Sequence, residues 1–184
     1  NGCDTCKLNP EFENVYKEIC SKFDFSEKIK NYGNEYIKKT FNNNKFISLH
    51  LRYSDYGNDD LKNTTKCYNE SDINKLIIDI TKKENISAEN IFIATSNQNR
   101  IINSDLKLYN LFKKDVNYEE LESFIEQYIC SMSEIFIYSG AVACIDKSNH
   151  IHKRSTWSSF VLDYRTFLLN KVSNRNIYLS DIFI

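Results

Sequence analysis

The stretch Phe46-Ile-Ser-Leu-His-Leu-Arg-Tyr-Ser-Asp55 predicts a short strand that ends in polar residues. Its apolar residues are strand formers in a short run, which indicates a strand over residues 46–52. His50 and Arg52 are two residues apart near its end, so both are expected on one face of the strand. Asp55 follows just past the strand. In an open α/β sheet ligands bind beyond the carboxyl ends of strands, and a guanidinium there can hold a phosphate through two hydrogen bonds.

The same residues also have a plainer interpretation. Arg52 and Asp55 could form a surface ion pair, and His50 could be hydrogen-bonded to the backbone. Taken alone, the stretch favours this second interpretation, so a ligand site needs support from other segments.

The composition is typical of one globular domain. The 184 residues are 41% hydrophobic and 14% aromatic, which is enough for a sizeable core. A net charge of −1 gives no reason to expect a nucleic-acid or anionic-membrane surface. One Pro and four Gly argue against a turn-dense all-β fold. No run of apolar residues is long enough to cross a membrane. Because the chain begins at Asn1 without a signal peptide, we expect a processed chain or a fragment.

Six cysteines suit disulfide bonds formed in an oxidising compartment. They are at positions 3, 6, 20, 67, 130 and 144, and N-glycosylation sequons are at Asn63, Asn69 and Asn85. We predict a bond between Cys130, at the end of a predicted helix, and Cys144, in the loop after the next strand. The other four cysteines are then expected to pair among themselves.

Cys3 and Cys6 leave a second possibility open. Their Cys-Asp-Thr-Cys spacing also fits a redox or metal-binding pair, which makes a disulfide oxidoreductase an alternative class. No second Cys pair or His pair lies at zinc spacing, and the pair stands at a chain end rather than between a strand and a helix.

Apolar spacing predicts helices that alternate with strands. Helices are expected from Pro10 after an Asn9 cap, from a capping box at Asp24-Phe-Ser-Glu27, after a Ser71 cap, over 118–132, and from a Ser155 cap to about Asn170, with a short one near 98–104. Strands are expected over 46–52, 91–95 and 135–138, with a short one near 106–112, and loops over 56–70 and 140–154. This alternation indicates an α/β fold with a parallel sheet.

Polar residues follow three of these strands, at the same edge of the predicted sheet. Ser96 ends the second strand, and Ser155, Thr156 and Trp157 open the helix after the third. A helix N-terminus offers free N–H groups and partial positive charge, which suits a phosphate, although Ser155 could be a plain cap. The convergence favours a phosphate-bearing ligand.

Several common nucleotide-binding motifs are absent. No Gly-x-Gly-x-x-Gly and no Walker loop occurs, which argues against NAD and ATP. No Asp-x-Asp pair is present to hold a divalent metal, so Arg52 and the helix terminus are expected to neutralise a diphosphate without metal.

Four segments, in this order, resemble the GDP-fucose-dependent protein O-fucosyltransferases. Residues 50–55 resemble the family's His-x-Arg-x-x-Asp motif, and residues 91–96 its second strand, which normally ends in Ala-Thr-Asp. Residues 126–138 are similar to its Asp-Gln-x-Ile-Cys helix and the strand that follows. Residues 155–165 resemble its Ser-Thr-Phe-Ser motif, including a later Arg. The resemblance covers residues 25–167 and is closest to the type that modifies thrombospondin-type repeats.

The resemblance implies the C-terminal, donor-binding half of a GT-B glycosyltransferase, which has two Rossmann-like halves. On this basis residues 1–24 are a Cys-containing helical segment and residues 25–184 a Rossmann-like nucleotide-sugar donor-binding domain. The implied reaction transfers fucose from GDP-fucose to Ser or Thr of a folded, Cys-rich protein acceptor, with inversion and without metal. The implied compartment is the lumen of the secretory pathway, in the endoplasmic reticulum or Golgi.

The resemblance also implies a role for each motif residue. His50 is expected to contact the nucleotide, and Arg52 to contact the β-phosphate and stabilise the leaving GDP as the catalytic residue. Ser155, Thr156 and Trp157 are expected to hold phosphate and fucose. The expected donor-binding set is His50, Arg52, Asp55, Ser96, Glu126, Ser155, Thr156 and Trp157, with no metal ligand.

The sequence departs from the family pattern at several of these positions. Ser96 and Glu126 replace aspartates, the second of them near the guanosine, and Trp157 stands where Phe is usual. Residues 140–154 are an insertion. The family's candidate general base lies in the N-terminal half, which the match does not include, so the chain alone is expected to bind donor weakly. A secreted binding module that kept the fold and lost catalysis is the alternative.

Overall fold

A five-stranded parallel sheet, in the order β4-β3-β1-β5-β7, forms the centre of the protein. The computed structural model describes residues 10–51, 65–67, 70–95, 108–109, 121–139, 144–146, 156–171, 175–179 and 182. The strands of this sheet are β1 (Ile47–Leu51), β3 (Ile91–Thr95), β4 (Leu108–Tyr109), β5 (Ile135–Tyr138) and β7 (Asn176–Tyr178). A separate antiparallel pair consists of β2 (Thr65–Cys67) and β6 (Cys144–Asp146). The prediction of a Rossmann-like parallel sheet flanked by helices is confirmed.

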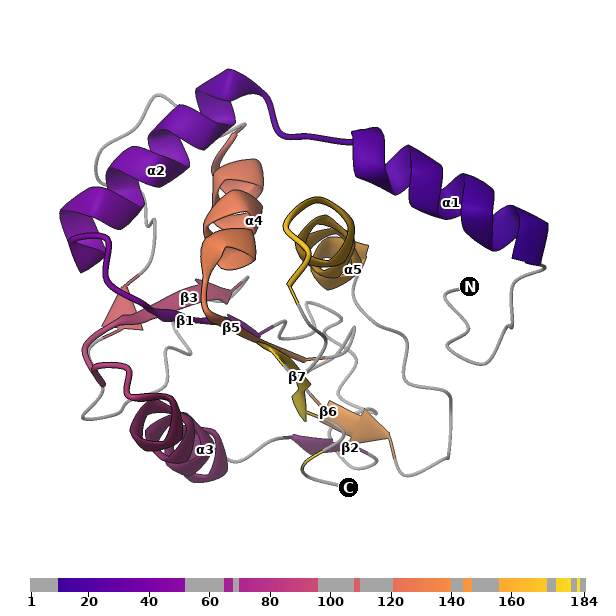
Figure 1. Cartoon of the computed structure of the whole chain (residues 1–184). Coiled ribbons are helices and arrows are strands. Elements are labelled where there is room, and N and C mark those ends of the chain that lie inside the picture. Colours follow the sequence, from indigo (N-terminus) through magenta and orange to yellow (C-terminus); the bar gives the residue numbers. More distant parts are fainter. Residues whose placement is uncertain are drawn as a thin grey trace.

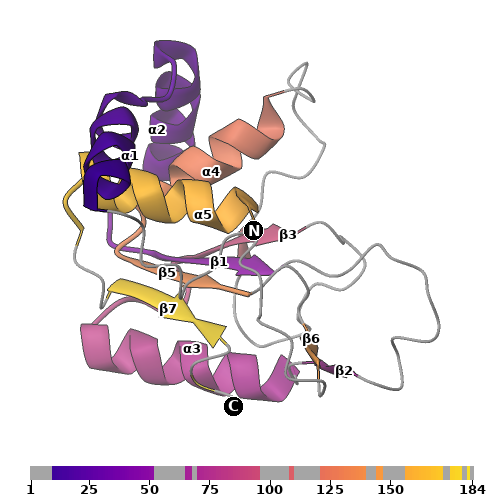
Figure 2. The same ribbon diagram turned by 90° about the vertical axis from the view of Figure 1, so that its right-hand side faces the viewer.

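Helices cover both faces of the sheet (Figures 1 and 2). They are α1 (Pro10–Lys22), α2 (Glu27–Phe41), α3 (Glu70–Glu84), α4 (Glu122–Met132) and α5 (Thr156–Asp163), which continues as a π-helical turn η3 (Tyr164–Leu168). α2, α4 and α5 lie on one face and α3 lies on the other (Figure 1). Helices and strands therefore form three layers, as the alternation in the sequence predicts.

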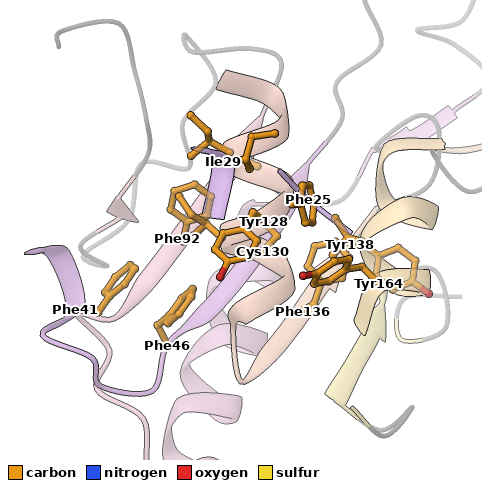
Figure 3. Close-up of a cluster of buried hydrophobic side chains, with 14 of the residues drawn as sticks. Phe25, Ile29, Phe41, Phe46, Phe92, Tyr128, Cys130, Phe136, Tyr138 and Tyr164 are labelled. Atoms are coloured by element: carbon orange, nitrogen blue, oxygen red, sulfur yellow. The ribbon is translucent and has the colours of Figure 1, made fainter. Parts of the chain in front are cut away.

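The alternation of side chains along the central strand separates two hydrophobic cores. In β1, Ile47, Leu49 and Leu51 belong to the core on the α3 side, with Ile77 of α3. The intervening side chains face α4 and α5, because successive residues of a strand point to opposite faces. Figure 3 shows the aromatic cluster on that second side, which includes Tyr128 of α4. His50 belongs to this alternate set and is therefore directed to the α4 and α5 side.

Two helices begin differently from the prediction. Ser26, not Asp24, is the N-cap of α2, and its hydroxyl accepts a hydrogen bond from the Ile29 N–H. The Asp24 carboxylate instead accepts hydrogen bonds from Lys30 and from the hydroxyl of Tyr164, each at 2.8 Å. The carboxylate therefore makes these two hydrogen bonds in place of the helix cap that the sequence pattern predicted. α3 begins at Glu70, so the predicted cap Ser71 lies inside the helix.

Three strands are found where none was predicted. β2 and β6 lie in the stretches 56–70 and 140–154, which we expected to be loops, and β7 was not predicted. Each is three residues long, so the hydrophobic pattern is too short to identify it, and each depends on a partner remote in sequence. The strand near 106–112 is confirmed over β4, and the helix predicted near 98–104 lies outside the described residues.

The predicted disulfide between Cys130 and Cys144 is wrong. Cys130 is a free thiol in α4 with no exposed surface, and burial raises the pKa of that thiol well above its ordinary value. Cys20 is also free, so it does not pair with the remaining cysteines as expected. In the last turn of α4 the side chain of Cys130 points into the core and not toward β6. Cys3 and Cys6 lie outside the described residues.

The predicted helix from Pro10 is confirmed, but its apolar face is largely exposed. Phe12, Val15 and Ile19 of α1 are each more than half exposed. The helix is held by a hydrogen bond from the Tyr16 hydroxyl to Asp163, and the residue just after it contacts α5 through the edge-on pair of the Phe23 and Phe160 rings. The division of the chain at residue 24 stays a prediction. No helix within the described ranges is long and apolar enough to span a membrane.

One buried cation and one partly buried cation hold the end of α4. The Arg165 guanidinium, fully buried, donates to five backbone carbonyls. These are the carbonyls of Cys130, Ser131, Ser133, Glu134 and Arg175. Lys171 donates to the carbonyls of Ser131, Met132 and Ser133. Cations near a helix C-terminus satisfy carbonyls that have no partner in the helix. Arg165, which belongs to the motif segment 155–165, therefore has a structural role in this chain.

Candidate active site

The imidazole of His50 is held by α5 at the carboxyl end of β1. His50 is 6% exposed, and its Nδ1 atom shares a hydrogen bond of 2.7 Å with the hydroxyl of Ser158. Ser158 lies in the first turns of α5 and is fully buried. The bond holds the ring in position, and because a hydroxyl both donates and accepts, Ser158 can pair with Nδ1 in either tautomer of His50.

Trp157 fixes the plane of the same ring and connects it to α4. Its indole stacks on the His50 imidazole, with ring centroids 4.1 Å apart and planes inclined by 20°. The indole Nε1–H donates a hydrogen bond of 3.0 Å to the Ser123 hydroxyl in the first turn of α4. Residues of β1, α5 and α4 are thus connected in series, from His50 through Trp157 to Ser123. A side chain held in this way is preorganised, since little freedom remains to be lost when a ligand binds.

Glu126 lies one turn after Ser123 along α4. Burial, with a smaller contribution from the negative charge of Glu122, raises the pKa of its carboxyl to about 8. The cause is desolvation, which disfavours the charged form. At neutral pH this carboxyl therefore keeps its proton and can both donate and accept a hydrogen bond.

Glu126 should make the protein less stable as pH rises. The unfolded chain loses this proton near its ordinary pKa of 4.5, whereas the folded protein keeps it up to about 8. Between these values the unfolded state binds fewer protons, so rising pH favours unfolding. Relative to the parent, Glu126→Gln should gain at least about 1.4 kcal/mol between pH 5 and pH 8, the value of one pKa unit.

Urea denaturation of both proteins at pH 5 and pH 8 measures this difference. Glu122→Gln is the matched control, because it removes a carboxyl from the same helix one turn earlier. Equal dependence on pH in the parent and in Glu126→Gln would show that Glu126 ionises normally.

The structure describes only part of the predicted donor-binding set. His50 and Trp157 are in contact, Glu126 lies on the helix to which Trp157 is bonded, and α5 begins at Thr156 as predicted. The remaining four positions lie outside the described residues, and their roles stay predictions. They are Arg52, Asp55, Ser96 and Ser155.

Two polar side chains of this site were missing from the predicted set. Ser158 is part of the segment that carries the fourth motif, but its register against His50 depends on how α5 packs on β1. Ser123 could have been suspected only from its spacing of three residues before Glu126, which places both on one side of a helix.

No group of three potential metal ligands occurs among the described residues. A small apolar pocket between α1 and α5, lined by residues such as Ile19, Phe23 and Phe160, contains none of the predicted donor-binding residues. The polar residues gathered around His50 are therefore the candidate site within the described part of the chain.

Known proteins resemble this chain in sequence and in fold. The family model described as GDP-fucose protein O-fucosyltransferase matches residues 6–142. GDP-fucose protein O-fucosyltransferase 2 of Plasmodium berghei (strain Anka) is 33% identical over 141 residues, which are 70% of this chain and 27% of that protein. The protein of the same name from Plasmodium falciparum (isolate NF54) is 33% identical over 125 residues, 61% of this chain and 25% of that protein.

The fold also matches solved structures of POFUT1. The complex with GDP-fucose superimposes with a TM-score of 0.57 at 12% identity, covering 89% of this chain and 49% of that chain. The apo form gives a TM-score of 0.55 over the same shares. The chain thus spans about a quarter of its curated relatives and about half of these structures. Because the family model covers well over half of its residues, this chain belongs to the GDP-fucose protein O-fucosyltransferase family.

Proposed function

We propose that this chain is the donor-binding domain of an O-fucosyltransferase, which transfers fucose from GDP-fucose to a Ser or Thr of a protein acceptor. The observation that carries the proposal is His50, held between Trp157 and Ser158 at the carboxyl end of β1. Ligands of open α/β sheets bind at this edge. A family named for GDP-fucose supports the identity of the donor.

Each proposed role is the one that the family motif implies for the residue at that position. His50 contacts the nucleotide, Glu126 lies near the guanosine, and the Arg52 guanidinium binds the β-phosphate. Ser155, Thr156 and Trp157 hold phosphate and fucose at the start of α5, and Asp55 and Ser96 complete the donor site. N–H groups at a helix start favour a phosphate in this position.

The proposed reaction inverts the configuration of the sugar and uses no metal. The acceptor hydroxyl oxygen attacks the anomeric carbon of fucose from the face opposite GDP. The bond from that carbon to the β-phosphate oxygen breaks, and its electron pair stays on GDP. Arg52 neutralises the charge that develops there. The hydroxyl proton goes to a base in the other half of the enzyme.

The remaining parts of the proposal concern what works with this domain. An N-terminal half completes the donor cleft, since the chain spans about half of the POFUT1 structures. The acceptor is a folded, Cys-rich protein domain of the thrombospondin-repeat type. The reaction takes place in the lumen of the secretory pathway, in the endoplasmic reticulum or Golgi.

Calorimetry with GDP tests the donor site directly. We expect weak, saturable binding that is the same in EDTA and in Mn²⁺, because cationic and N–H groups of the protein neutralise the diphosphate. His50→Ala should weaken binding at least tenfold, as loss of a preorganised contact to a charged ligand costs about 1.5–3 kcal/mol. Lys82→Ala, in the last turn of α3 on the opposite face of the sheet, is the control. Strict dependence on Mn²⁺ would contradict the proposal.

A secreted binding module that kept the fold and lost catalysis is the second candidate. Ser96 and Glu126, which stand where the family has aspartates, favour it. Failure of both this domain and the longer protein to bind GDP or GDP-fucose would support the binding module over the enzyme.

A further inference from the structure

Two cysteines lie opposite each other in the small antiparallel sheet. β2 and β6 pair with Thr65 opposite Asp146, Lys66 opposite Ile145 and Cys67 opposite Cys144. Cys67 is the last residue of β2 and Cys144 is the first of β6. The pairing places two thiol-bearing residues in register, although 76 residues separate them in the sequence.

Directly opposed residues of an antiparallel pair meet the distance requirement of a disulfide. Their Cα atoms are about 5.5 Å apart in a hydrogen-bonded position and about 4.5 Å apart in the other kind of position. Disulfides span Cα separations of about 4.4–6.8 Å, so both kinds allow the bond. We propose that Cys67 and Cys144 form a disulfide bond that fastens β2 to β6.

Two other cysteines are excluded as partners by their places in the fold. Cys130 is a free thiol enclosed in the core under α4, and Cys20 is a free thiol on α1. Cys20 lies beside α5 and η3, next to Asp163 and Leu168, rather than beside β2 or β6. Within the described part of the chain, the cross-strand pair is therefore the one combination that the backbone brings together.

The bond forms by thiol–disulfide exchange with a protein disulfide as oxidant. The Cys67 and Cys144 thiols lose two protons and two electrons and form one S–S bond. The oxidant's disulfide accepts these and becomes two thiols. Such oxidants act in compartments where structural disulfides persist.

The bond joins the chain segments that leave two neighbouring strands of the main sheet. β1 and β5 are adjacent and parallel. β2 is the next strand after β1, and β6 is the next strand after β5. Figure 2 shows β2 and β6 beyond the carboxyl ends of β1 and β5. A covalent link here limits how far the two segments can separate.

This restraint has a consequence for the donor site, which rests on the proposed function. Arg52 lies between β1 and β2 in the sequence, and Ser155 lies between β6 and α5. These two of the proposed phosphate-binding residues therefore belong to segments that the disulfide joins. Loss of the bond should weaken GDP binding at least threefold, since more conformational freedom must then be lost on binding.

Peptide mapping tests the bond itself. The oxidised chain is denatured, alkylated without reduction, deglycosylated enzymatically, and cut with trypsin and a glutamate-specific protease. Cleavage after Glu134 separates Cys130 from Cys144, which trypsin alone would leave on one peptide. We expect residues 67–70 linked to residues 135–147, and Cys20 and Cys130 alkylated. Alkylated Cys67 and Cys144, or either one linked to another cysteine, would overturn the proposal.

The double variant Cys67→Ser/Cys144→Ser separates the bond from its consequence. It should lack the linked peptide and bind GDP at least threefold more weakly than the oxidised parent, while Cys20→Ser should match the parent. If the parent contains the linked peptide but the double variant binds GDP as tightly as the parent, the restraint on the donor site is overturned. Absence of GDP binding in the parent would instead count against the proposed function and not against the bond.

Discussion

Arg52→Ala is expected to lower fucose transfer about 10²–10³-fold while leaving the fold intact. Its guanidinium is proposed to act where charge builds on GDP as the bond to fucose breaks, and removing one such preorganised donor has an effect of this size. Stability should change by no more than about 1 kcal/mol, because a charged residue that follows the end of a strand in the sequence is expected at the surface.

Transfer should be measured in the longer protein that contains the N-terminal half, with a folded acceptor domain. Arg52→Lys should also fail, because an ammonium group cannot reproduce the planar fork of a guanidinium. Lys82→Ala, which removes a cation on the other face of the sheet, should keep the parent rate. Near-parental transfer by Arg52→Ala would mean that the segment after β1 does not supply the phosphate contact.

Arg165→Met is expected to destabilise the fold by on the order of 3–5 kcal/mol. The substitution roughly preserves volume but removes every donor from a fully buried side chain that serves five carbonyls. Buried carbonyls left without donors carry their full desolvation cost, about 1–3 kcal/mol each, which Lys171 can only partly offset. Loss of a buried charged partner is similarly severe.

Urea denaturation followed by fluorescence of Trp157, the one tryptophan in the sequence, measures the change. Arg175→Met is the matched control: its guanidinium pairs with Glu84 and Glu134 near the surface. Partly exposed pairs contribute little, so the control should cost about 1 kcal/mol or less. If Arg165→Met does not fold, Arg165→Lys should fold with an intermediate loss. An Arg165→Met protein as stable as the Arg175→Met control would refute the role of Arg165.

The positions of the main strands were predictable from sequence because their signal is local and strong. Residues 47–51, 91–95 and 135–138 are short apolar runs that are buried on both faces, as in a parallel sheet covered by helices on each side. The two-residue period of a strand also predicted that His50 and Arg52 lie on one face, and the structure directs His50 to the α4 and α5 side. Short strands such as β2 and β6 carry no such signal, since three residues cannot establish a period.

Polar partners were much harder to predict than apolar faces. The sequence pattern at Asp24 fits a helix cap, yet its carboxylate is bonded to Lys30 and Tyr164, the second of them 140 residues away. The predicted bond from Cys130 failed for the same reason. Proximity in the sequence suggested Cys144 as its disulfide partner, but in α4 the Cys130 side chain points into the core.

The sequence by itself determined the parallel α/β fold, the family, and the strand that carries His50, because hydrophobic periods and motif order are properties of the chain alone. Only the tertiary structure decided that Ser158 and Trp157 hold His50, that the Arg165 guanidinium donates to backbone carbonyls, and that Cys67 lies opposite Cys144. Each of these depends on the register of elements far apart in sequence, and register is set by how whole faces pack.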